Sequence, residues 1–313
     1  MVVRPTLTLI AFVLTLVTAY AQQPETLSLL GKPLVAPSLP DDTRQKLEAD
    51  LAAARAAYEK NPEDPDAVIW LGRRTAYLGR FGEAIEIFTR GIEAHPNEAR
   101  LYRHRGHRFI TIRKFDLAIK DLTKAAQLVE GKEDEVEPDG QPNERNVPTS
   151  TLQTNIYYHL GLAHYLKAEF TDALDAYRKC LALSKNPDMV VATTNWLYMT
   201  LERLGRHDQA REALAPITSG MDVIENKAYY RLLMFYKGQL SAATLKDKGT
   251  EGVTLAYGVA NHDLYTGSQD KAKAGFKQIV EKQAAQWPAF GYIAAESEMA
   301  RFAKADRKKH KGK

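Results

Sequence analysis

Apolar residues recur at steps of three and four along most of this chain, which is the spacing of one face of an α-helix. The first such stretch follows Pro40, where Asp41 or Asp42 can cap a helix. Asn61–Pro65 then interrupts the pattern, and Pro65 fits the first position of the next helix. The pattern therefore predicts short helices joined by turns. The apolar face of the first helix carries Leu47, Leu51, Ala54, Ala57 and Tyr58.

Two of the following helical stretches share the same residues at an interval of 34. Gly106 follows Gly72 by 34 residues, and Ala118 follows Ala84 by the same interval. A helix–turn–helix unit with this period is typical of a helical solenoid. Because one unit cannot bury its apolar face alone, copies must stack on one another, and the stack leaves a concave face for another molecule.

The repeated positions resemble those of the tetratricopeptide repeat (TPR) family, whose unit reads W-x2-L-G-x2-Y, then A-x3-F, then P. The resemblance implies an all-α fold, a right-handed TPR superhelix (α-solenoid) of antiparallel helix pairs. Four units match, the fourth more loosely than the others. The matching residues are Val68, Leu71, Gly72, Thr75, Ala84, Phe88 and Pro96; Tyr102, Arg105, Gly106, Phe109, Ala118 and Leu122; Tyr157, Leu160, Gly161, His164, Ala173 and Tyr177; and Thr194, Leu197, Tyr198, Leu201, Ala210 and Leu214.

An insertion interrupts the period between the second and third units. Gly106 and Gly161 are 55 residues apart, which is 21 more than one period, and the surplus is an acidic, Pro- and Asn-rich stretch at residues 131–151. A solvated loop is one interpretation. Because insertions in solenoids often lie on a binding face, a lid or partner-contacting segment is the other. The sequence of residues 138–143 is similar to one in exported bacterial TPR proteins.

Beyond Met221 the period weakens, although the helical pattern continues. We expect helices at 224–237, 251–265 and 269–282, with a short partner at 240–245. A final helix over 287–301 would shield the open end of the stack, and a basic tail at 302–313 is expected to be disordered. The predicted organisation comprises N-terminal TPR units at 41–130, the insertion at 131–151, C-terminal TPR and degenerate TPR-like units with a capping helix at 152–301, and the tail.

The first residues differ from the rest of the chain. Arg4 precedes an apolar run at residues 7–18, and Ala19 and Ala21 are small residues at the two positions that a signal peptidase reads. We therefore predict a signal peptide at 1–21, cleaved after Ala21, and an exported chain that is periplasmic or secreted. The run is shorter than the roughly 20 residues that cross a bilayer, so the mature chain would have no membrane span. An uncleaved anchor is the alternative.

A proline-rich segment at residues 22–40 follows the predicted signal peptide. Its prolines prevent a helix and favour extended backbone. The stretch Leu27–Val35 is nevertheless rich in apolar side chains. We therefore expect this segment to lie against the solenoid.

Composition changes this picture little. The chain is 44% hydrophobic and 26% charged, with a formal net charge of +4, which is ordinary for a globular protein and does not by itself indicate nucleic-acid binding. Cys180 is the only cysteine, so the chain cannot form an intramolecular disulfide. Its position among small packed residues predicts a buried, inert thiol.

The sequence contains no pattern typical of an active site. The pairs His104 with His107 and His159 with His164 have no nearby cysteine or suitably spaced carboxylate to complete a metal site. G-x-S-x-G, a phosphate-binding glycine loop and H-E-x-x-H are absent from the sequence. We therefore expect a non-catalytic protein with no metal and no cofactor.

The resemblance implies that the first helix of each unit lines the concave face. In the second unit Arg100, Arg103 and His107 are spaced three and four apart and share one face. Arginine binds carboxylate in a bidentate fork, and tyrosine gives rigid contact area. The candidate ligand-binding residues are Arg73, Arg100, Arg103, His107, Tyr158, Tyr165, Asn195 and Met199.

Three functions are compatible with these observations. We favour an interaction scaffold of the bacterial cell envelope that binds a protein or acidic peptide on its concave face, although Ile69 stands where the carboxylate-holding members of the family have lysine. In the second, Leu27–Val35 fills the chain's own groove as a structural element. The third, nucleic-acid binding through the basic tail, is disfavoured by export. The sequence leaves the partner and the oligomeric state open.

Overall fold

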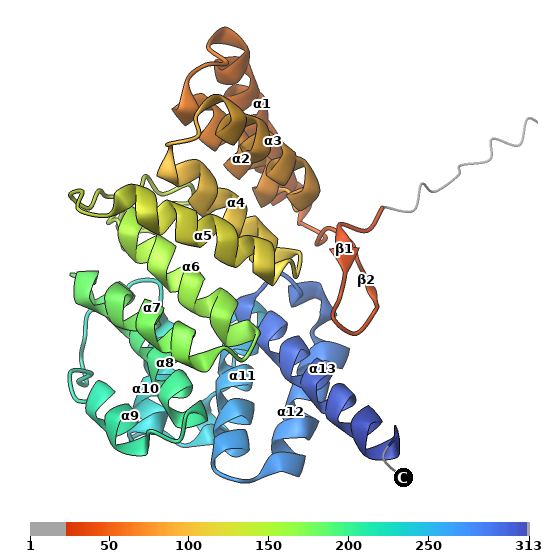
Figure 1. Ribbon diagram of the computed structural model, residues 1–313, viewed down its shortest axis with the longest axis vertical. Coiled ribbons are helices and arrows are strands. Elements are labelled where there is room, and N and C mark those ends of the chain that lie inside the picture. Colours follow the sequence, from red (N-terminus) through yellow and green to blue (C-terminus); the bar gives the residue numbers. More distant parts are fainter. Residues whose placement is uncertain (1–22, 312–313) are drawn as a thin grey trace, which may run out of the picture.

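The computed structural model describes residues 23–311, so the predicted signal peptide at 1–21 lies outside the described residues. Within this part the fold is an α-solenoid of antiparallel helix pairs (Figure 1). None of its helices is long and apolar enough to cross a membrane. The elements are β1 (Thr26–Leu27), β2 (Pro33–Leu34), α1 (Asp41–Lys60), α2 (Pro65–Tyr77), α3 (Phe81–Ala94), α4 (Ala99–Thr111), α5 (Phe115–Val129), α6 (Leu152–Leu166), α7 (Phe170–Leu183), α8 (Pro187–Arg203), α9 (His207–Ala213), α10 (Lys227–Tyr236), η1 (Ala242–Thr244), α11 (Gly249–Tyr265), α12 (Gln269–Lys282), η2 (Ala284–Gln286) and α13 (Phe290–Lys311).

The small residues of the repeat allow the two helices of a unit to approach closely. A Cβ atom added to Gly72 would lie 2.4 Å from the Phe88 ring, and one added to Gly161 would lie 2.7 Å from the Tyr177 ring. Any larger side chain would separate the helices, because protein interiors leave no spare volume. These positions of the repeat therefore serve packing between the two helices of a unit.

The turn inside each unit reverses the chain through one residue in the left-handed backbone region. Gly79 and Gly205 occupy this position in α2–α3 and α8–α9, with φ of 79° and 70°. Arg113 and Ala168 occupy it in α4–α5 and α6–α7, with φ of 65° and 64°. A side chain in this region costs about 1–2 kcal/mol, so these two turns carry strain that glycine would not.

Several helix boundaries differ from the prediction. Pro40, and not an aspartate, is the cap residue of α1, and both aspartates lie in its first turn, where negative charge favours a helix N-terminus. Trp287 precedes α13, which continues to Lys311. The expected disordered tail is therefore helical over 302–311, because no glycine or proline ends the helical pattern before Gly312.

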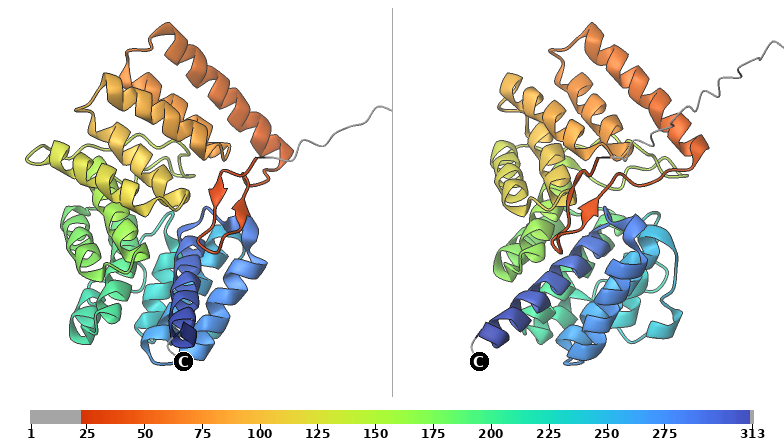
Figure 2. Two further views of the ribbon diagram at one scale, coloured as in Figure 1. Left: turned by 45° about the vertical axis from the view of Figure 1, so that its right-hand side comes forward. Right: turned by 90° about the vertical axis from the view of Figure 1, so that its right-hand side faces the viewer.

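The C-terminal helices do not simply extend the stack. Helices α10 and α11 pack against α8, and α13 contacts α6 (Figure 2). The hydroxyl groups of Tyr165 on α6 and Tyr257 on α11 are 2.9 Å apart, and Arg301 Nη1 donates to the Leu166 carbonyl at 2.9 Å. The C-terminal helices thus cover part of the inner side of the solenoid.

The N-terminal segment connects the α4–α5 turn with the C-terminal region. Its β1–β2 hairpin lies between the α4–α5 turn and α13 (Figure 2). Thr26 Oγ1 donates to the Ile112 carbonyl at 3.0 Å, and Trp287 Nε1 donates to the Val35 carbonyl at 2.7 Å. Leu29 N donates to Glu296 Oε1. The segment therefore lies against the solenoid, as its apolar residues predicted.

The single thiol is buried inside the third unit. Cys180 Sγ lies 3.3 Å from the Thr154 carbonyl, and burial raises the pKa of Cys180 to about 12. The thiolate required for reaction is therefore rare at neutral pH. The prediction of a buried, inert thiol is confirmed.

Candidate functional site

Two adjoining pockets lie on the concave side of the solenoid. The first, of about 210 Å³, we call the arginine pocket; it is lined chiefly by Arg73, Tyr77, Arg103, His104, His107, Arg108 and Glu137. The second, of about 400 Å³, we call the aromatic pocket; it is lined chiefly by Tyr158, His159, Met189, Ala192, Tyr229 and Phe290. The two are adjacent because both are also lined by Arg103, His107, Thr149, Ser150, Asn155 and Glu225.

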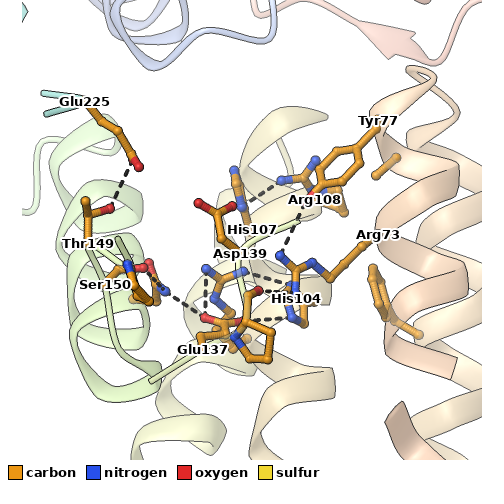
Figure 3. A pocket seen from close by; sticks show the side chains of 16 residues that line it. Arg73, Tyr77, His104, His107, Arg108, Glu137, Asp139, Thr149, Ser150 and Glu225 are labelled. Carbon is orange, nitrogen blue, oxygen red and sulfur yellow. Dashed lines mark hydrogen bonds and ion pairs between the residues drawn. The ribbon is translucent and has the colours of Figure 1, made fainter. Parts of the chain in front are cut away.

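The structure brings half of the predicted site residues together. Arg73 from α2 and Arg103 and His107 from α4 line the arginine pocket (Figure 3). Tyr158 from α6 lines the aromatic pocket. These four residues come from the first helix of three successive units, as the resemblance implied.

Arg100 lies apart from both pockets. It is in the first turn of α4, where its guanidinium is 2.9 Å from Glu98 Oε2 and 2.6 Å from Asp66 Oδ1. A hydrogen bond with Glu98, only partly opposed by burial, raises the pKa of Arg100. Helical spacing predicted that Arg100 shares a face with Arg103, but its acidic neighbours at the helix end hold its guanidinium and it lines neither pocket.

The remaining predicted residues are covered by the chain itself. Tyr165, Asn195 and Met199 are almost completely buried beneath the C-terminal helices. The sequence predicted a vacant concave face along the whole solenoid, and this is wrong for the part formed by the end of α6 and by α8. The physical reason is that α11 and α13 present their own apolar side chains to this surface and join its core cluster.

The insertion at 131–151 supplies a carboxylate to the arginine pocket. Glu137 is only 7% exposed. Its Oε2 atom is 3.1 Å from Arg103 Nη2 and accepts a hydrogen bond from Asn155 Nδ2 at 2.7 Å, and its Oε1 atom is 2.8 Å from His104 Nε2 (Figure 3). Burial opposes ionisation of Glu137, but the charge of Arg103, the interaction with His104 and the charge of Arg73 together outweigh burial and hold the pKa of this carboxyl well below its usual range.

The residues after Glu137 follow the surface of α2. Arg73 Nη1 donates to the Pro138 carbonyl at 2.8 Å, and Arg74 Nη1 donates to the Gly140 carbonyl at 2.9 Å. A Cβ atom on Gly140 would lie 2.0 Å from Tyr77 Oη. Glycine is therefore required for this close contact. Residues 131–151 form a loop whose side chains are mostly exposed, as the first interpretation has it, but Glu137 and Gly140 are buried and the segment contacts α2 and α4.

The far end of the insertion is attached to the segment that precedes α10. Arg145 Nη1 is 2.7 Å from Asp222 Oδ1. Thr149 Oγ1 donates to Glu225 Oε2 at 3.0 Å. The insertion thus forms an ordered strip that borders both pockets, and its contacts with the rest of the chain are polar.

The arginine pocket carries more guanidinium groups than its ion pairs use. Among the described residues, neither Arg73 nor Arg108 has a carboxylate within 4.0 Å. Arg108 Nη2 instead lies 2.6 Å from His107 Nδ1. Burial, together with the nearby charges of Arg103 and Arg73, lowers the pKa of Arg108 to about 10. An arginine pocket with two cations that lack an acidic partner is suited to an anionic group.

The histidines of the two pockets remain neutral at physiological pH. Burial and the charge of Arg103 lower the pKa of His104 and of His159 to about 3. Burial also lowers the pKa of His107 well below its usual value. The rings of His107 and His159 are 4.3 Å apart. These imidazoles therefore offer hydrogen bonds and ring surface, while the arginines supply the charge.

Sequence reasoning missed two important residues of the pocket. Arg108 follows His107 on α4. The sequence did not identify it as a candidate site residue, because repeat positions alone do not show that the α4 surface curves around a cavity. Glu137 is one of five acidic residues between 133 and 139. Nothing in the sequence distinguishes it from the other four, since its burial depends on contacts with α4 and α6.

Comparison with known proteins identifies tetratricopeptide repeats in two parts of the chain. Family models described as tetratricopeptide repeat match residues 48–99 and 154–187. No curated protein matches the chain. Among solved structures, a tetratricopeptide repeat protein from Parabacteroides merdae is 16% identical, covers 80% of this chain and 93% of its own, and has a TM-score of 0.48. YrrB, described as a TPR protein with an unusual peptide-binding site, is 15% identical with coverages of 74% and 95% and a TM-score of 0.43. MamA is 19% identical with coverages of 65% and 98% and a TM-score of 0.42.

Proposed function

We propose that this chain, a tetratricopeptide-repeat protein, is a non-catalytic interaction scaffold that binds an acidic segment of a protein partner on its concave face. The observation that carries the proposal is the arginine pocket. It combines Arg103, already paired, with Arg73 and Arg108, which have no carboxylate partner among the described residues. Charged groups placed in this way favour an anionic partner, and the adjoining aromatic pocket provides apolar contact area.

The size of the pockets favours a chain segment over a broad protein surface. The aromatic pocket, about 400 Å³, falls within the range of roughly 300–1,000 Å³ that is typical of ligand pockets. The insertion and the C-terminal helices restrict access to the rest of the concave wall. The partner would therefore contribute a few residues here and make its other contacts outside the cavity.

Crosslinking in intact cells, followed by mass spectrometry, tests the proposal. The double variant Arg73→Gln/Arg108→Gln removes the two unpaired charges and leaves the Arg103–Glu137 ion pair in place. Capture of the partner should fall about tenfold or more, because each lost charge-assisted hydrogen bond costs about 1.5–3 kcal/mol. Arg55→Gln/Arg206→Gln is the matched control, since both side chains are exposed outside the pockets. Equal capture by the two variants, with equal helical circular dichroism, would remove the pocket from the proposed function.

We further infer that the scaffold acts in the bacterial cell envelope. The apolar run at residues 7–18 and the small residues Ala19 and Ala21 support export. N-terminal sequencing of the chain recovered from the periplasmic fraction or the medium should begin at Gln22. Full-length chain recovered from the cytoplasmic fraction alone would contradict this location.

A further inference from the structure

The segment at residues 136–140 forms one wall of the arginine pocket and contacts α2 and α4 in the manner of a bound peptide. It has no helix or turn, and begins with an isolated β-bridge between Val136 and Thr151. One side chain, Glu137, is enclosed by Arg103, His104 and Asn155. The following residues contribute main-chain carbonyl groups, which accept hydrogen bonds from two arginines of α2.

We propose that residues 136–140 are an internal surrogate for the partner, and that the pocket recognises an extended acidic peptide whose glutamate takes the place of Glu137. This inference rests on the proposed function. The partner segment would displace the insertion from α2 and α4 and would form the same side-chain and main-chain contacts.

The surrogate also defines a spacing. Glu137 is followed at the third position by Gly140, which is buried against Tyr77 Oη and Arg73 Nη2. A larger residue at that position would push against both groups. The two residues between them, Pro138 and Asp139, are exposed. The recognised motif is therefore a glutamate, two unrestricted residues and a glycine.

Displacement is physically reasonable because polar contacts attach the insertion. Among the described residues, none between 131 and 151 belongs to a hydrophobic core cluster. Val136 and Val147 are exposed. Polar contacts exchange with those of water or of a partner at a small net free energy, whereas removal of a core element would expose apolar area at about 25 cal/mol per Å².

Because residues 136–140 are covalently joined to the chain, they compete for the pocket far more effectively than a free peptide does. A segment joined by a short flexible linker competes at an effective concentration of about a millimolar. The wild-type chain should therefore bind a free copy of the motif weakly. A chain whose insertion is loosened should bind it about tenfold or more tightly.

The test uses a fluorescent peptide with the sequence of residues 136–141, Val-Glu-Pro-Asp-Gly-Gln, and the full chain. Fluorescence anisotropy measures its affinity for wild type and for Gly140→Val, whose added methyl groups would clash with Tyr77. Arg145→Gln is the second variant, because it removes the ion pair with Asp222 at the far end of the insertion and leaves every group that contacts residues 136–140 unchanged. Hydrogen exchange over residues 136–140 reports whether the insertion has left the pocket.

The expected result is tighter binding by both loosened variants, and at least about tenfold weaker binding of a peptide with glutamine in place of its glutamate. Equal affinity for the two peptides would overturn the proposal. Continued protection of residues 136–140 in both variants would also overturn it, because displacement requires a segment that can leave. If the partner is still captured but the loosened variants do not bind the peptide, this inference is wrong and the proposed function stands. If the peptide binds but the Arg73→Gln/Arg108→Gln variant captures the partner as well as wild type does, the proposed function is wrong.

Discussion

The two parts of the concave wall use equivalent positions of the repeat but differ in what covers them. On α4, Arg103 and His107 face two cavities and a polar insertion. On the end of α6 and on α8, Tyr165, Asn195 and Met199 face helices and are buried. We call the first the insertion-covered half and the second the helix-covered half.

The difference shows that the repeat determines where a side chain points but not what it meets. Residues outside the matching repeats, at 131–151 and in α11 and α13, decide which part of the wall is accessible. The insertion-covered half retains space because polar contacts hold its cover. The helix-covered half is closed because its cover adds to the hydrophobic core. Four predictions test this comparison.

Acid should destabilise the insertion-covered half most strongly. His104 and His159 have a pKa of about 3 in the folded chain against an ordinary value near 6.5, so the unfolded chain binds more protons between these values. Stability is therefore complete above pH 6.5 and falls as pH decreases, by roughly 4 kcal/mol per pH unit when His107, whose pKa is also lowered, is counted with these two. Urea unfolding at pH 7, 6 and 5 measures the slope. His159→Gln should reduce it by about a third, and Gln127→Asn, an exposed control that does not titrate, should not; a flat profile down to pH 4.5 would contradict the assignment.

Breaking the buried ion group of the helix-covered half should give the next largest loss. Glu298 is almost completely buried between Arg203 and Arg301, and its Oε2 accepts a hydrogen bond from Arg301 Nε at 3.1 Å. Glu298→Gln should lower the free energy of unfolding by about 3–5 kcal/mol, because this buried carboxylate is the counter-charge of both Arg203 and Arg301. Urea denaturation measures the loss. The control Glu281→Gln alters a half-exposed carboxylate and should change stability by less than about 0.5 kcal/mol.

The same substitution in the insertion-covered half should cost less. Glu137→Gln removes the counter-charge of a single arginine, Arg103, which lies beside a cavity that water can enter. We expect a loss of about 2 kcal/mol, with Glu133→Gln, at an exposed position of the same insertion, as a near-neutral control. A loss for Glu137→Gln larger than that for Glu298→Gln would show that the two halves do not differ as described.

The smallest effect concerns the turn between α6 and α7, which follows the helix-covered end of α6. Ala168 has a φ of 64°, so Ala168→Gly relieves backbone strain. It should raise the free energy of unfolding by about 0.5 kcal/mol. Ala163→Gly, at a buried position inside α6, should instead lower it by about 1 kcal/mol or more. Thermal unfolding of the two variants measures both, and a loss at Ala168 would contradict the strain.

Much of the fold could be predicted because it depends on local pattern. Pro65 begins α2 and Gln269–Lys282 is α12, both as expected. The close contacts of Gly72 and Gly161 follow from residues within one unit. Short-range spacing determines each of these features, so a single sequence contains enough information.

The covering of the wall could not be predicted in this way. Apolar residues on α11 showed that one face would be buried, but not that α8 would lie against it. Helical spacing grouped Arg100 with Arg103, while the carboxylates that hold Arg100 elsewhere come partly from the preceding unit. Glu137 became a pocket residue through Arg103 and Asn155, on two different helices. Each of these outcomes depends on contacts between segments distant in sequence.

The hairpin at the start of the described chain imposes an order on folding. The Leu29 N–H donates a hydrogen bond to Glu296, which is 267 residues later in the sequence. The Val35 carbonyl accepts a hydrogen bond from Trp287, which also lies near the end of the chain. Contacts of such long sequence separation form late, because the intervening chain must be ordered first. The residues that a ribosome completes early can therefore reach their native positions only after the last helix has been made.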